Sequence, residues 1–219
     1  MTQFFSFVAT GPARDPARTM VMLDRGLTAL GARIDSDLHP VVFDSQRGVF
    51  DVPPDRPGID FDKFYDNMLP TLNWAGAYVA YQVEGATFHF LVGRVNNDWA
   101  DIFTEIDFKA LTRLFQAGKI GTYYRALAAA ARAGRATTGF GRIELPFRPA
   151  SRDQALAAIF SDPDHPGAPC SLGLASREIY SEKELERKAG GRFIISEAPN
   201  GFWILEERDW RRAMTALPW

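Results

Sequence analysis

Two stretches of the chain have the pattern of antiparallel strand pairs, and they constrain the fold more than any other feature. Residues 76–95 (GAYVAYQVEGATFHFLVGRV) alternate apolar and other side chains on both sides of Glu84-Gly85. Residues 192–205 place two apolar runs around Asn200-Gly201, and both residues of an Asn-Gly turn tolerate positive φ. Because each hairpin pairs sequential strands, the chain predicts an α+β fold with mainly antiparallel sheet and packed helices.

Capping residues and helical spacing predict where the helices begin. Asp15 and Pro16 supply an N-cap and a first-turn proline for a helix that runs to about residue 31. Ser181 with Glu184 has the form of a capping box, and so has Ser151 with Gln154. Further strands are expected at 3–10, 39–44, 47–53, 139–147 and 170–176, and a short helix is expected at 60–69.

Residues 98–134 read as a run of helices. Trp99, Ile102 and Ile106 recur at helical spacing, but the apolar residues after Phe108 fall on a different face. We therefore predict a break near Asp107, which would cap the next helix. Gly118 would end that helix, and the alanine-rich segment 121–135 would form another that packs closely on a neighbour.

The two ends of the chain repeat one order of elements. Each reads as a β-α-β-α-β-β-α unit, and each contains an Asp-Trp dipeptide that would open a helix, at Asp98-Trp99 and at Asp209-Trp210. Either an internal duplication or the chance recurrence of a common α+β pattern explains this order. On the first reading, residues 1–219 form one compact domain with pseudo-repeat halves 1–107 and 138–219, joined by helices in 108–134.

Composition excludes several classes of protein. The chain has 219 residues, of which 46% are hydrophobic, and a net charge of −2, so we expect a folded globular chain without a broad nucleic-acid footprint. No apolar run approaches the roughly 20 residues that span a bilayer. Cys170 is the single cysteine, which suits a reducing compartment. We expect a cytoplasmic protein that neither enters a membrane nor binds nucleic acid.

No stretch has the spacing of a catalytic or metal-binding motif. His39, His89 and His165 are far apart, and neither a paired-cysteine nor a zinc-protease pattern occurs, so no metal or cofactor is expected. Cys170 with His165 lacks the surroundings of an activated thiol, and Ala117–Thr122 (AGKIGT) reads as a connection between helices. The chain is therefore expected not to be an enzyme. The alternative is an enzyme or small-ligand binder with a pocket between the two halves, for which Tyr81, His89, Arg142 and Glu144 are the candidate polar groups.

Acidic and aromatic segments favour a protein-binding function instead. On a helix, Asp98, Asp101 and Glu105 would form an acidic stripe beside the apolar face. The last hairpin adds Trp203, Glu206 and Glu207, although its aromatic residues also fit a structural core. Among small α+β proteins, this combination predicts a bacterial immunity protein that binds and blocks a cognate toxin. The oligomeric state is left open.

Overall fold

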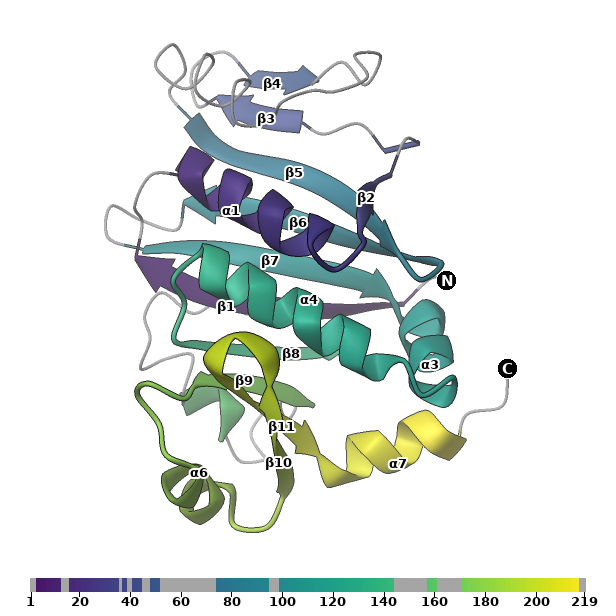
Figure 1. Cartoon of the computed structure of the whole chain (residues 1–219), viewed down its shortest axis with the longest axis vertical. Helices are drawn as coiled ribbons and strands as arrows, with labels where there is room; N and C mark the ends of the chain where they lie inside the picture. Colours follow the sequence, from purple (N-terminus) through teal and green to yellow (C-terminus); the bar gives the residue numbers. More distant parts are fainter. Residues whose placement is uncertain are drawn as a thin grey trace.

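A single antiparallel sheet runs through the molecule (Figure 1). The computed structural model describes residues 3–12, 16–35, 37–38, 41–44, 48–51, 74–94, 99–143, 157–160 and 171–216. The strand order of the sheet is β10-β11-β9-β8-β1-β7-β6-β5-β3-β4, and the short strand β2 also pairs with β5. The strands are β1 (Phe4–Pro12), β2 (Arg33–Ile34), β3 (Val41–Asp44), β4 (Gly48–Asp51), β5 (Trp74–Val83), β6 (Ala86–Arg94), β7 (Trp99–Asp107), β8 (Thr138–Ile143), β9 (Leu172–Ser176), β10 (Phe193–Ala198) and β11 (Phe202–Glu207).

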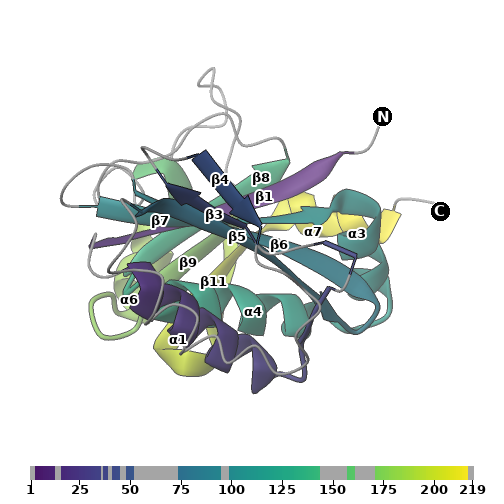
Figure 2. The same ribbon diagram turned by 90° about the horizontal axis from the view of Figure 1, so that it is seen from above.

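Helices cover the sheet unevenly. They are α1 (Pro16–Thr28), α3 (Phe108–Gln116), α4 (Ile120–Ala133), α6 (Glu182–Ala189) and α7 (Arg208–Ala216), and the short turn η2 (Pro199–Gly201) links β10 to β11. α1 and α4 lie side by side on one face of the sheet (Figures 1 and 2). Phe5, Phe7 and Ala9 of β1 belong to the same hydrophobic core as buried residues of α1 and α4. Successive strand residues point to opposite faces, and Val8 joins α6 residues in a second core on the other face.

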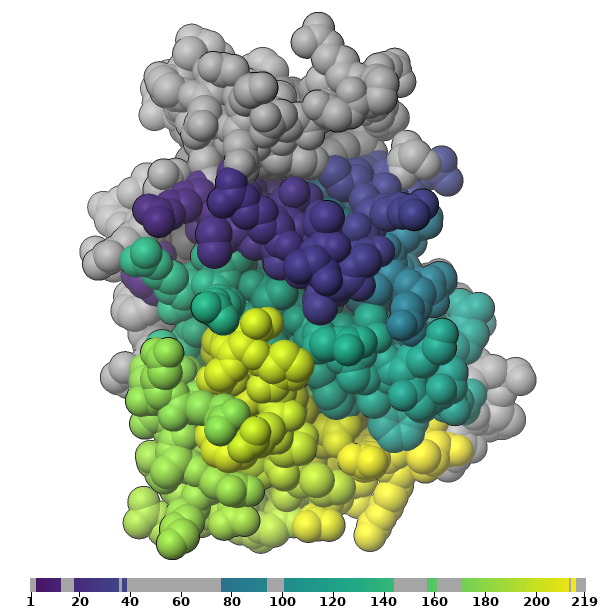
Figure 3. All heavy atoms as spheres, in the orientation of Figure 1, coloured from purple at the N-terminus to yellow at the C-terminus, as the bar shows by residue number. Residues whose placement is uncertain are grey.

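Small residues allow α1 and α4 to approach closely. A Cβ atom on Gly26 of α1 would lie 3.2 Å from the Cβ of Ala129 on α4. The alanines of α4 are buried in the same layer. The prediction that the alanine-rich helix packs closely on a neighbour is confirmed, and the pair leaves its outer side on the molecular surface (Figure 3).

The expected α+β class and both hairpins are confirmed. β5 pairs with β6 across Glu84 and Gly85, whose φ angles are +50° and +79°, and β10 pairs with β11. Asn200 and Gly201 also have positive φ, within the three-residue turn η2. The side chain of Asp107 accepts a hydrogen bond from the Ala110 N–H at 3.0 Å, so it caps α3 as predicted. The expected helix at 60–69 and the capping box at Ser151 lie outside the described residues.

Residues 99–107 form strand β7, so the helix predicted from residue 98 is wrong. Ile102, Thr104 and Ile106 alternate with Asp101, Phe103 and Glu105, and a nine-residue segment with this pattern fits a strand as well as a helix. β7 pairs along its whole length with β1 and over seven residues with β6. These long-range pairings decide the conformation. Trp99 and Trp210 are consequently not equivalent, since one lies in a strand and the other in α7.

The structure does not show the internal duplication. Outward from the centre of the sheet, the N-terminal part reads β1-β7-β6-β5, and the C-terminal part reads β8-β9-β11-β10. In the N-terminal part, the strand between β1 and the hairpin is β7, which comes after the hairpin β5–β6 in the sequence. In the C-terminal part, the strand between β8 and the hairpin is β9, which comes before the hairpin β10–β11 in the sequence. The division into pseudo-repeat halves stays a prediction. Among the described residues, no helix is both long and apolar enough to span a lipid bilayer.

Candidate functional site

The acidic residues predicted to bind a partner do not form an exposed helical stripe. Asp98 lies outside the described residues. Asp101 and Glu105 lie on strand β7, where residues four apart share a face. Asp101 is only 1% exposed, and Glu105 is half-buried and accepts a hydrogen bond from the Ser6 hydroxyl at 3.0 Å. Their role in binding stays a prediction, but burial argues against Asp101 as a contact residue.

The candidate residues of the last hairpin also have structural roles. Trp203 is 8% exposed, and its indole N–H donates to the backbone oxygen of Tyr180 at 2.9 Å. Glu207 is half-buried and pairs with Arg192, with 3.6 Å between Nε and Oε1. Burial raises the pKa of Glu207. The alternative interpretation of this hairpin as part of the core therefore describes these side chains better than an exposed contact surface does.

Glu206 lies at the centre of a buried polar cluster. Its side chain is 4% exposed and accepts hydrogen bonds from the Tyr124 hydroxyl and from Arg211, the latter at 2.6 Å. The three residues come from β11, α4 and α7. Burial, reinforced by the neighbouring Glu206, raises the pKa of Tyr124, so its phenol stays protonated and donates. Glu206 thus ties two helices to the sheet.

A row of polar side chains crosses five strands, β8, β1, β7, β6 and β5, on the sheet face opposite α1 and α4. Residue pairing places Arg142 of β8 beside Ser6, Ser6 beside Glu105, and Glu105 beside His89. The Tyr78 hydroxyl lies 2.7 Å from Nδ1 of His89, and the two rings stack. We call Ser6, Tyr78, His89, Glu105 and Arg142 the polar row. It brings a phenol, an imidazole and a carboxylate together on the neighbouring strands β5, β6 and β7, and Ser6 and Arg142 continue the row onto β1 and β8.

The environment of the polar row shifts its titrating groups. Burial lowers the pKa of His89, although the carboxylates of Glu105 and Asp35 act in the opposite direction. Burial and the same carboxylates raise the pKa of Tyr78. For Asp35, burial alone would raise the pKa, but hydrogen bonds from Gln82, the Asp37 N–H and Thr87 outweigh it and lower the pKa. Near neutral pH, His89 is therefore held in its neutral form beside anionic groups.

The structure places two of the four groups expected for an inter-half pocket in one cross-strand row, with β1 and β7 between them. His89 and Arg142 belong to the polar row, and Glu144 lies outside the described residues. Tyr81 points to the other face, where its hydroxyl donates to Asp24 of α1 at 2.6 Å. No group of three or more histidine, cysteine or carboxylate side chains with metal-binding geometry occurs within the described ranges.

A second candidate site lies on the helix layer. Exposed arginines follow the outer side of α1, α4 and the turn after α4, and we call them the arginine face: Arg18, Arg25, Arg125, Arg132 and Arg135. α4 contains no acidic residue, and the single one in α1, Asp24, is half-buried beneath Tyr81. In the sequence, Arg125, Arg132 and Arg135 form a basic strip along the alanine-rich segment, and interhelical ion pairs would explain such a strip. Within the described part of the chain, the side chains of Arg132 and Arg135 make no such pair.

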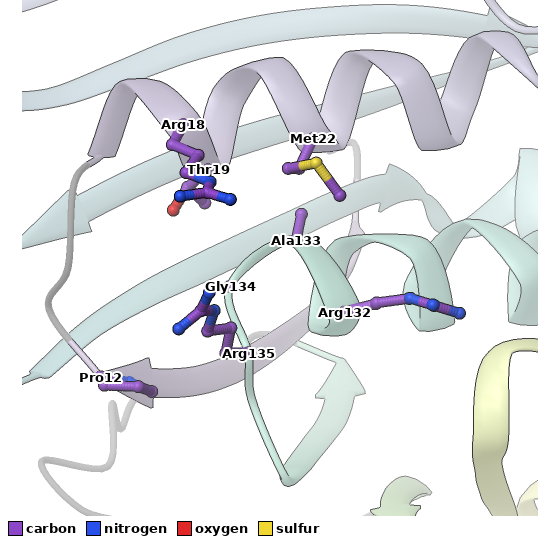
Figure 4. A pocket seen from close by; sticks show the side chains of 8 residues that line it. All are labelled: Pro12, Arg18, Thr19, Met22, Arg132, Ala133, Gly134 and Arg135. Atoms are coloured by element: carbon purple, nitrogen blue, oxygen red, sulfur yellow. The ribbon is translucent and has the colours of Figure 1, made fainter.

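One end of the arginine face is hollowed into a pocket of about 340 Å³, which we call the arginine pocket. It lies between the first turn of α1 and the end of α4. Arg18 and Arg135 lie on opposite sides of it, whereas Arg132 extends along α4 away from them (Figure 4). The remaining lining residues are Pro12, Thr19, Met22, Ala133 and Gly134. The described lining thus combines guanidinium groups with a partly apolar wall and includes no carboxylate.

These features define an α+β protein built on one antiparallel sheet, with a basic helix layer on one face and a polar row on the other. A comparison with models of protein families gives no match, and a comparison with curated proteins gives no significant relative. Interpretation of its function therefore rests on the two sites.

Proposed function

We propose that this chain is a non-catalytic binding protein that recognises an acidic surface of a protein partner through its arginine face. The observation that carries the proposal is the arginine face itself, five exposed arginines on neighbouring elements whose outer side carries no exposed acidic residue. The helices are packed on the sheet, so the backbone that carries these arginines is already ordered before binding. Preorganisation of this kind lowers the conformational entropy cost of association.

The partner we propose is a toxin domain that the chain blocks as an immunity protein does. The small size, the α+β fold and the lack of an established catalytic motif support this form of the proposal. The charge of the proposed binding surface is opposite to that of the acidic surface expected from the sequence. The exposed charged side chains described on α1 and α4 are arginines, whereas Asp101 is buried. Blocking a toxin inside the producing cell would place the protein in the cytoplasm, which its single cysteine suits.

A nucleic-acid partner fits the arginine face less well than a protein does. Proteins that bind single strands combine basic grooves with aromatic side chains on which bases stack. The large hydrophobic side chains exposed in the described part of the chain are Met22 and Ile179, and neither is aromatic. The net charge of −2 also gives no general attraction for a polyanion.

Charge reversal tests the protein-binding proposal. The variant Arg25→Glu/Arg125→Glu changes two exposed arginines on the face, and Arg187→Glu/Arg212→Glu makes the same change in charge on α6 and α7. Binding to the product of the adjacent gene would be measured by calorimetry and stopped-flow kinetics. We expect the first variant to weaken binding at least about tenfold, mainly through slower association at low salt. The second variant should bind like the wild type. Equal affinity in both folded variants would refute the role of the arginine face, and tighter binding to oligonucleotides than to the protein would refute the partner class.

The polar row favours a second candidate function, small-ligand binding or catalysis on the sheet face opposite α1 and α4. The observation that supports this second function is the contact between Tyr78 and His89, together with Glu105 as the cross-strand neighbour of His89. Tyr78, His89 and Glu105 are only half-buried. A neutral imidazole that contacts a phenol and neighbours a carboxylate has the groups needed for proton transfer.

A thermal-shift screen against classes of metabolites tests this second function. A ligand of the polar row should raise the melting temperature of the wild type, and the shift should be lost in Tyr78→Phe and His89→Phe. Tyr180→Phe serves as the control, because Tyr180 does not belong to the polar row and packs in the second core with Leu185 of α6 and Trp203 of β11. A shift that persists in both polar-row variants would place the ligand elsewhere.

A further inference from the structure

We propose that the arginine pocket binds a small phosphorylated compound through a phosphate or diphosphate group. Arg18 and Arg135 face the same hollow from α1 and from the turn after α4, and Arg132 borders it (Figure 4). A guanidinium presents its N–H donors in a planar fork that matches pairs of phosphate oxygens. This ligand is distinct from the protein partner proposed above, and its binding does not depend on that partner.

The backbone of Arg135 supplies an independent argument. Arg135 has φ of +52°, in the left-handed region where glycine is the favoured residue. Its side chain makes no hydrogen bond or ion pair within the described residues that would explain an arginine at this position. A left-handed residue commonly ends a helix, so the observation that supports a role for this side chain is the presence of arginine where glycine is usual.

Helix ends do not oppose an anion in this pocket. The C-terminal carbonyls of α4 would repel a phosphate if they were free, since they carry partial negative charge. The oxygens of Ala130, Ala131 and Arg132 instead accept hydrogen bonds from the backbone N–H groups of residues 134–136, at 2.8–3.1 Å. The other wall is formed by Arg18, Thr19 and Met22 of α1, which carry no negative charge.

The size and the apolar wall of the pocket favour a phosphorylated compound over an isolated carboxylate. Its volume of about 340 Å³ is at the lower end of the range for small-ligand sites. A carboxylate alone would leave most of that space unfilled. A phosphate attached to an organic group could contact Arg18 and Arg135 while that group lies against Met22 and Ala133.

Calorimetry with pyrophosphate and a nucleoside diphosphate, at near-physiological ionic strength, tests the proposal. We expect saturable binding to the wild type with Kd below about 1 mM. Arg18→Gln and Arg135→Gly should each weaken it at least about tenfold, since each removes a charged hydrogen-bond donor. Arg135→Gly should remain folded, because glycine relieves the positive φ. Arg125→Gln is the matched control on the same face outside the pocket, and it should bind like the wild type.

Three results would overturn the proposal. The first is absence of saturable binding to both phosphate compounds at concentrations up to about 10 mM, well above the expected Kd. The second is unchanged affinity in folded Arg18→Gln and Arg135→Gly. The third is binding of citrate as tight as that of pyrophosphate, which would show a general anion site. Loss of the protein partner in Arg25→Glu/Arg125→Glu with phosphate binding retained would separate the two proposals and support this one.

Discussion

Glu206 shows how a single buried carboxyl group can organise several elements. It is 3% exposed, and a carboxylate in such a position is costly unless hydrogen-bond donors surround it. Tyr124 and Arg211 supply those donors from α4 and α7. Arg211 also lies over the ring of Phe115 on α3, with 5.9 Å between its Cζ and the ring centroid. One carboxylate therefore joins α4, α7 and, through Arg211, α3 to the sheet.

Removing either donor should destabilise the fold. We expect Tyr124→Phe and Arg211→Met each to lower the free energy of unfolding by about 1.5–3 kcal/mol, because each leaves part of the Glu206 carboxylate without a donor. Arg212→Met is the control, since Arg212 and Asp209 are both more than four-fifths exposed. It should cost less than about 0.5 kcal/mol. Urea unfolding measures all three, and an Arg211→Met variant as stable as Arg212→Met would contradict this role of Glu206.

His89 should make stability depend on pH just below neutrality. Burial lowers its pKa in the folded state below the ordinary value of 6.5, so the unfolded chain binds the proton more readily. Stability should therefore be greatest above that value and fall as the pH drops from about 7 toward the lowered pKa. The slope of unfolding free energy against pH between about 7.5 and 6 should decrease in His89→Gln. An identical slope in that variant would show that another group titrates.

At the scale of whole elements, features specified by adjacent residues could be predicted, whereas a strand that depends on long-range pairing could not. Both hairpins and the Asp107 cap could be predicted because a few adjacent residues specify a turn or a helix start. Strand β7 could not be predicted, because its spacing fits two periodicities. Its conformation depends on pairing with β1, which is 95 residues away in the sequence at the centre of the pairing, between Val8 and Phe103. The predicted acidic stripe was lost with that helix.

Glycines mark where elements approach most closely, and two of them give opposite predictions. A Cβ atom at Gly11, at the end of β1, would lie 2.0 Å from the backbone oxygen of Gly134, whereas one at Gly121 in α4 would meet nothing within 4 Å. We expect Gly11→Ala to destabilise the fold by more than about 2 kcal/mol through overpacking. Gly121→Ala should stabilise it by about 0.5–1 kcal/mol, because alanine favours helix. Urea unfolding measures both, and a harmless Gly11→Ala would mean that β1 and α4 can separate without cost.

At the scale of the whole molecule, both candidate sites depend on distant segments coming together. The arginines of α4 were visible as a strip in the sequence, but the contribution of Arg18 could not be predicted without the packing of α1 against α4. Likewise, His89 and Arg142 were candidates for one pocket, while Ser6 takes part through sheet register and Tyr78 through its contact with His89. Pairing across five strands has no local sequence signal, which is why the polar row was only partly predicted.

The continuous sheet predicts that the two parts of the chain unfold together. β1 pairs with β7 on one side and β8 on the other, and a single core contains Phe5, Ile106, Leu174 and Ile204. Separating the parts would expose that core and leave β1 and β8 each without one of their two neighbouring strands. Hydrogen exchange should therefore give backbone amides of β7 and β9 opening free energies within about 1 kcal/mol of each other.

The edge pair β3–β4 is the internal reference for this experiment. β4 has one neighbouring strand in the sheet, so its amides should exchange through smaller openings than those of β7. If β9 instead exchanges as readily as β4 while β7 stays protected, the C-terminal part opens by itself. That result would favour two units of limited mutual dependence, as the predicted division at residues 108–134 implies, over the single cooperative sheet.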